Sequence, residues 1–135
     1  IYLNQRRTQV VSFLAVFDAP SIVFNSLSRP RSTMPLQSLA LLNSEFAANR
    51  AKSLAERLVA LHPQQAALMV NEAYLRLVAR PASAAEIELA KAFVEQQSRA
   101  YAAEHSDADK SLNSVLALAD LCQMLMASNE FLYWE

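Results

Sequence analysis

Apolar residues recur at intervals of three and four along most of this chain, a pattern typical of helices that bury one face. Such stretches are separated by proline or by short polar runs. They cover residues 5–17, 34–43, 44–61, 64–79, 83–103 and 110–127. We therefore expect an all-α fold, a single compact and irregular bundle of about five to six helices with a long N-terminal loop, forming one domain over residues 1–135.

Local sequence signals mark where several of these helices begin and end. Asn43-Ser44 offers an N-cap for the helix that follows. Arg80-Pro81 stops the helix at 64–79, because the residue before proline is displaced from the α region. Ser83-Ala84-Ala85-Glu86 is a capping box, in which the hydroxyl and the carboxylate each accept a hydrogen bond from a backbone N–H. A new helix is therefore expected to begin directly after Ser83.

The last long helix, at 110–127, is apolar around most of its circumference. Its polar residues form a narrow strip of Asn113, Asp120 and Gln123. A helix of this kind is enclosed by other helices, so we expect it at the centre of the bundle. The aromatic residues at 131–134 are expected to lock the end of the chain onto the core.

An irregular connection is predicted between Asp18 and about residue 33, and connections of that length in compact domains are often functional. The planar guanidinium of arginine suits carboxylate, phosphate or sulfate. The candidate contact residues around this loop and the short helix after it are Asp18, Arg29, Arg31, Gln37 and Asn43. Two interpretations remain open: these side chains line a cleft, or Asp18 and Asn43 cap helices while the arginines brace the loop.

Composition limits the chemistry that this chain can perform. It contains no glycine, although 53% of its residues are hydrophobic, so phosphate-cradling loops and nucleotide fingerprints are disfavoured. The formal net charge of −1 gives no reason to expect nucleic acid or an anionic membrane surface as a partner. No apolar stretch is long enough to span a bilayer. The basic half, residues 1–60, is expected to pack against the acidic half, residues 61–135.

Residues that could perform catalysis or bind metal are few. Cys122 is the single cysteine and lies in an apolar stretch, where we expect a buried, unreactive thiol. His62 and His105 lie far from it in sequence, and the acidic residues, Glu86 among them, are expected to face solvent. We therefore predict no catalytic residue, no metal site and no cofactor in this domain alone. The chain starts at Ile1 without a signal peptide, and we expect it to be a fragment of a larger protein.

Four motifs in this order resemble the PSD1, or DUF1553, domain. They are Phe17-Asp18-Ala19-Pro20, the run from Pro35 to Asn43, Ala73-Tyr74-Leu75-Arg76-Leu77 with Arg80-Pro81, and Ser128-Asn129-Glu130-Phe131-Leu132-Tyr133. The likeness covers essentially the whole chain. The sequence departs from the family where a glycine usually precedes the Arg-Pro pair, since it has Ala79 there.

The resemblance implies a cellular context and no established activity. Such domains form the C-terminal part of large exported proteins of Planctomycetes and related bacteria, commonly beside a DUF1549 domain and a planctomycete-type cytochrome c domain. We accordingly expect a periplasmic or extracellular helical module that contacts neighbouring domains of its own polypeptide, with haem c held elsewhere in the protein. The alternative is that it contributes an anion-binding, carbohydrate-binding or active-site cleft to a larger enzyme.

Overall fold

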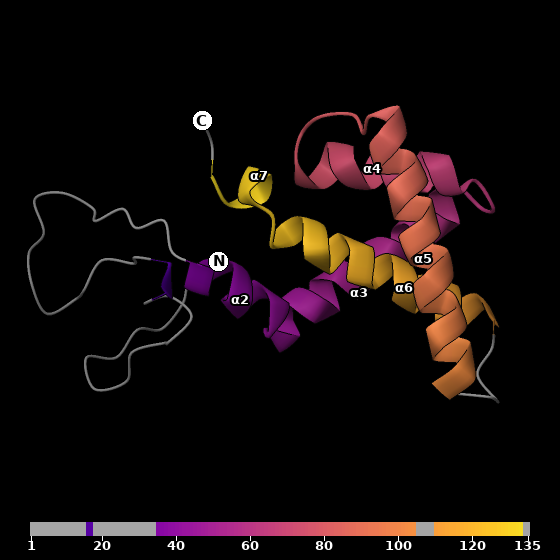
Figure 1. Ribbon diagram of the computed structural model, residues 1–135, viewed down its shortest axis with the longest axis horizontal. Helices are drawn as coiled ribbons and strands as arrows, with labels where there is room; N and C mark the ends of the chain where they lie inside the picture. Colours follow the sequence, from indigo (N-terminus) through magenta and orange to yellow (C-terminus); the bar gives the residue numbers. More distant parts are fainter. Residues whose placement is uncertain (1–15, 18–34, 105–109, 134–135) are drawn as a thin grey trace, which may run out of the picture.

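A computed structural model describes residues 16–17, 35–104 and 110–133, and over these residues the chain is helical with no strand (Figure 1). The helices are α2 (Pro35–Leu42), α3 (Glu45–Leu61), α4 (Ala66–Leu77), α5 (Ala84–Glu104), α6 (Lys110–Met126) and α7 (Asn129–Leu132). The predicted all-α class is confirmed, and α2 to α6 begin and end within two residues of the predicted ranges, whereas α7 is a short helix that the sequence analysis does not predict. Most of the predicted helix at 5–17 and the connection at 18–33 lie outside the described residues.

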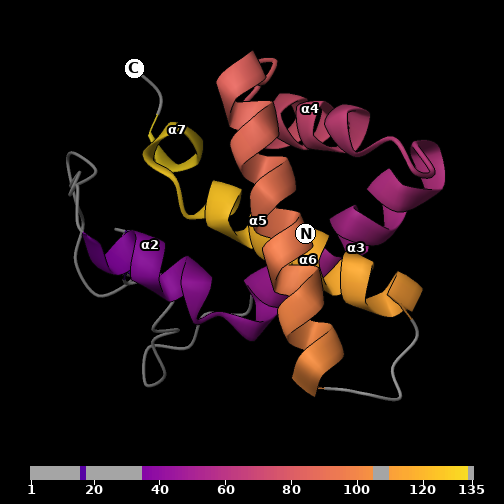
Figure 2. The same cartoon turned by 45° about the vertical axis from the view of Figure 1, so that its right-hand side comes forward.

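Helix α6 is the centre of the described structure, as its nearly continuous apolar surface predicts. It contacts each of the other described helices, most extensively α3 and α5. Figures 1 and 2 show α5 crossing α6, with α2 and α4 toward opposite ends of the molecule. The best-buried side chains of α6 form one core with residues of α3, α4 and α5, and this core contains Ala51, Ala55, Leu58, Val70, Ala73, Ala90, Leu118, Ala119, Leu121, Cys122 and Leu125.

The buried face of α3 is built largely from alanine. Ala47, Ala51 and Ala55 follow one another at intervals of four residues and are almost fully buried, and Leu58 continues the same face. Side chains four residues apart lie on the same side of a helix. Because a methyl group projects little from the backbone, this face allows α3 and α6 to pack closely.

Side-chain caps begin three of the helices. The hydroxyl of Ser44 accepts from the backbone N–H of Ala47 at 3.3 Å, so Ser44, not Asn43, is the N-cap of α3. The predicted capping box is present: Ser83 N–H donates to Glu86 Oε2 at 2.7 Å, and Glu86 N–H donates to Ser83 Oγ at 3.3 Å. The short helix α7 is capped by Ser128. These contacts satisfy N–H groups that have no partner within their helix.

The connections on either side of α4 place ordinary residues in the left-handed region of backbone conformation. Gln64, before α4, has φ of 61°, and Ala79, after α4, has φ of 57°. Glycine adopts this conformation without a steric cost, whereas a residue with a Cβ does not. A chain without glycine therefore makes these two turns under local strain.

The polar strip of α6 makes hydrogen bonds to two other helices, α5 and α2. Asp120 accepts a hydrogen bond from the Tyr101 hydroxyl at 2.8 Å, and Gln123 Nε2 donates to the backbone oxygens of Leu41 at 3.3 Å and Leu42 at 2.9 Å. Asn113 is only 2% exposed, and its Oδ1 has no hydrogen-bond partner in the described structure.

None of the described helices has the length and hydropathy of a membrane span.

Candidate functional site

Gln37 is the one predicted contact residue that lies buried in the described structure, at 5% exposure. Its Nε2 donates to the backbone oxygen of Val16 at 3.2 Å, and its Oε1 accepts from the Tyr133 hydroxyl at 2.6 Å. Gln37 on α2 therefore bonds both to Val16, before α2 in the chain, and to Tyr133, directly after α7. Both ends of its amide are engaged within the chain, which favours a bracing role at this position over contact with a ligand.

Asn43 lies just beyond the last residue of α2, and its side chain is exposed. Its backbone N–H donates to the Leu39 oxygen at 3.0 Å, which completes the last turn of α2. Asp18, Arg29 and Arg31 lie outside the described residues, so their predicted role in an anion-binding or bracing loop stays a prediction.

A cluster of charged side chains centred on Arg80 lies where the α4–α5 connection meets α7. The guanidinium makes two hydrogen bonds to Glu86, from Nη2 to Oε1 at 2.7 Å and from Nη1 to Oε2 at 3.0 Å. It also makes three contacts of 2.9 to 3.2 Å to the carboxylate of Glu130 on α7. The same group lies 5.4 Å from the ring centre of Tyr74. The planar fork of arginine suits such bidentate contacts, which lysine cannot reproduce.

Electrostatics in this cluster favour the charged forms of both Arg80 and Glu86. Hydrogen bonds from Arg80, together with those at Ser83, lower the pKa of Glu86 from 4.5 to about 2. Hydrogen bonds to Glu86 and Glu130 raise the pKa of Arg80 above its usual range. A carboxylate that is so strongly favoured as an anion is a poor general acid or base near neutral pH. The cluster therefore fits a structural junction better than an acid–base site.

Polar contacts join helix α7 and the residue after it to distant parts of the structure. The helix contains no buried residue. Glu130 is joined to Arg80, and Tyr133, the residue after the helix, is joined to Gln37. The predicted aromatic lock is thus present at Tyr133 as a hydrogen bond, while Phe131 is 41% exposed. Trp134 lies outside the described residues.

Glu86 keeps contact with solvent as predicted, with 28% of its side chain exposed, but its carboxylate is also bound by Arg80, a contact that the sequence analysis missed. A local signal for the pairing of Arg80 with Glu86 is present in the sequence: Arg80 lies six residues before Glu86, in the turn that leads into the capping box. The pairing of Arg80 with Glu130, fifty residues away, carried no local signal.

Reactive groups in the described structure are isolated from one another. Cys122 is fully buried, and burial raises the pKa of its thiol to about 12, so it remains a protonated core residue as predicted. No group of three or more metal-ligating side chains is found among the described residues.

The motifs that the sequence places far apart therefore meet at one corner of the fold: Gln37 with Tyr133, and Arg80 with Glu130. A family model described as "PSD1: Protein of unknown function (DUF1553)" matches residues 1–94, so the C-terminal member of each pair lies beyond the matched range. Neither a curated protein nor a solved structure matches the chain.

Proposed function

The chain belongs to the PSD1 family (DUF1553), and we propose that it is a non-catalytic interaction module that docks onto neighbouring domains of a larger protein. The observation that carries the proposal is an apolar surface on α2 and the first turn of α3, which we call the α2 face. The residues of the α2 face are Leu36, Leu39, Leu42 and Phe46.

The α2 face exposes four large apolar side chains to solvent. Leu36, Leu39 and Leu42 recur every three residues along α2 and are 52%, 51% and 46% exposed, and Phe46 is 64% exposed. Phe46 also lies 5.3 Å from the Arg50 guanidinium. Single exposed leucines are ordinary, but several on one helix face mark a surface that other proteins contact.

Charge is absent from the centre of this surface and present at its edge. Helix α2, with the sequence PLQSLALL, has no ionisable side chain. Protein interfaces have centres depleted of charged residues, with aromatic residues and arginine enriched. The leucines of α2 with Phe46 and Arg50 beside them follow that pattern, which supports docking of an apolar partner surface.

The family resemblance supplies the context of the proposal. The domain is proposed to act within a large exported protein, in the periplasm or outside the cell, with its own neighbouring domains as partners. An electron-transfer function, with haem c bound by a cytochrome c domain of the same polypeptide, is part of this proposal and would need no cofactor in the chain described here.

Binding to the adjoining domains of the full-length protein, produced separately, tests the proposal by isothermal titration calorimetry. The variant Leu36→Ser/Leu39→Ser is expected to weaken binding about tenfold or more, because a leucine stabilises an interface chiefly through the apolar surface that it buries on binding. Leu89→Ser is the matched control, since Leu89 is an exposed helical leucine on α5, 72% exposed and outside the α2 face. Equal binding by the double variant, or no binding by the original chain, would refute the proposal.

A further inference from the structure

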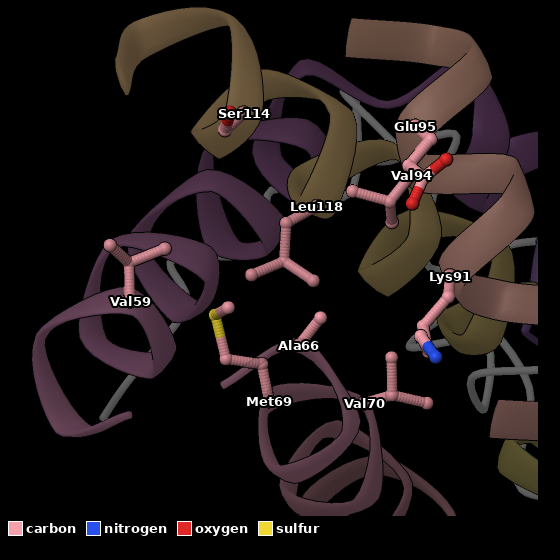
Figure 3. Close-up of a pocket in the computed structure, with 9 residues that line it drawn as sticks. All are labelled: Val59, Ala66, Met69, Val70, Lys91, Val94, Glu95, Ser114 and Leu118. Atoms are coloured by element: carbon pink, nitrogen blue, oxygen red, sulfur yellow. The ribbon is translucent and has the colours of Figure 1, made fainter. Parts of the chain in front are cut away.

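A cavity opens between α3, α4, α5 and α6, and none of its wall residues belongs to the α2 face. Its volume is about 100 Å³. The wall is formed by Val59 of α3, by Ala66, Met69 and Val70 of α4, by Lys91, Val94 and Glu95 of α5, and by Ser114 and Leu118 of α6. Figure 3 shows the aliphatic groups of Met69, Val70, Val94 and Leu118 around the cavity, with Lys91 and Glu95 together on the α5 side.

Part of the cavity wall belongs to the hydrophobic core, whereas other wall residues are exposed to solvent. Val70 and Leu118 are almost fully buried and belong to the core cluster. Ala66, Glu95 and Ser114 are exposed at the rim. A molecule can therefore enter without unfolding any of the described helices, and it would meet a wall that packing already holds in place.

The chemistry of the wall selects against water and against charge. A bound water needs about two to four polar partners, and six of the nine side chains in the wall are apolar and supply none. The two ionisable side chains already have partners on their own helix: Lys91 Nζ lies 3.0 Å from Glu88 Oε1, and Glu95 Oε2 lies 3.7 Å from Arg99 Nη2. Both charges are already paired and most of the wall is apolar, so a neutral, apolar occupant fits best.

We propose that this cavity binds a small, neutral, apolar molecule of about the size of benzene. An apolar cavity of roughly 150 Å³ in a protein core accommodates benzene, and the cavity described here is of the same order and open on one side. This inference is independent of the proposed docking function, because it involves other residues and another class of ligand.

Benzene, benzoate and benzylamine are matched probes, since they share a ring and differ in charge. Titration of the whole chain, followed by methyl NMR, is expected to show shifts for benzene that are confined to residues such as Val59, Val70 and Leu118. Benzoate and benzylamine are expected to bind about tenfold more weakly or not at all, because their charge would be buried without a partner. Tighter binding of either charged probe, or benzene shifts centred on Leu36 and Leu39, would overturn the proposal.

Two variants fill the cavity from opposite walls, Ala66→Leu on α4 and Ser114→Leu on α6. Both positions are exposed, so folding is expected to persist and is checked by circular dichroism. Each variant is expected to weaken benzene binding about tenfold. Ala60→Leu is the matched control, because Ala60 is exposed on α3 and does not line the cavity. If both filling variants bind benzene as the original chain does, the ligand site is not this cavity.

Discussion

Arg80 and Glu130 are fifty residues apart in the sequence and are joined by three contacts between the guanidinium and the carboxylate, of 2.9, 3.0 and 3.2 Å. Arg80 contacts Glu86 at the same time, so one side chain connects the start of α5 to α7. Because α7 has no buried residue, these contacts and the hydrogen bond from Tyr133 to Gln37 hold the C-terminal segment in place.

Replacement of Arg80 by methionine is expected to release α7 while the core stays folded. Backbone amides at 129–132 should then exchange with deuterium several-fold faster, whereas amides in the middle of α6 should be unchanged. Arg80→Lys is expected to give most of the same effect, since lysine keeps the charge but lacks the fork. Arg76→Met is the control: Arg76 pairs with Glu72 on its own helix and touches no part of α7. Unchanged exchange at 129–132 in Arg80→Met would contradict this role.

Stability is expected to fall in acid through Glu86. Its pKa is about 2 in the folded chain and 4.5 ordinarily, so the folded state favours the ionised carboxylate. The stabilisation is complete above about pH 4.5 and is lost as pH falls toward 2. The variant Glu86→Gln should therefore be less stable than the original chain at pH 7, and the difference should shrink between pH 4.5 and 2. Urea unfolding at several pH values measures it, and a constant difference would show that Glu86 is not the titrating group.

Ala79→Gly is expected to stabilise the chain by about 1 kcal/mol, because φ of 57° costs a residue with a Cβ roughly that much. The same substitution at Ala92, exposed inside α5, should destabilise it by about 1 kcal/mol, since glycine weakens a helix interior. Thermal unfolding separates the two, with shifts of about 4 °C in opposite directions. A loss of stability in Ala79→Gly would mean that this turn is not strained.

Asn113→Leu is expected to raise the free energy of unfolding by about 1 kcal/mol. The substitution replaces a buried amide, whose Oδ1 lacks a hydrogen-bond partner in the described structure, by an apolar group of similar size. Asn49→Leu on the exposed side of α3 controls for helix propensity and should change stability by no more than about 0.5 kcal/mol. If Asn113→Leu is destabilising, the amide has a partner in solution.

The elements that the sequence predicted well are those set by neighbouring residues. The capping box at Ser83 and Glu86 depends on a spacing of three, and the central position of α6 follows from its own composition. Periodicity shows which face of a helix is buried but not which other helix covers it. The contacts of Tyr133 with Gln37 and of Glu130 with Arg80 depend on how distant helices cross, so no local pattern indicated them.

The sequence analysis named Gln37 as a contact residue but did not predict what Gln37 contacts. Its polar side chain and its place beside a loop rich in arginine suggest a ligand contact, whereas in the structure its amide bonds to Val16 and Tyr133. The apolar periodicity at 34–43 predicts a helix that buries one face, whereas Leu36, Leu39 and Leu42 are about half exposed. No local sequence pattern distinguishes a leucine that is buried within its own chain from one that is exposed and available to a partner.

The run of alanines along α3 restricts how this domain can diverge. Ala47, Ala51 and Ala55 are almost fully buried, so a side chain longer by a single carbon at any of these positions would clash and increase the distance between α3 and the helices packed against it. Residues on the outer side of α3, such as Lys52 and Glu56, are under no such restriction. Relatives that keep this arrangement can therefore change the outside of the helix widely while these positions stay limited to the smallest side chains.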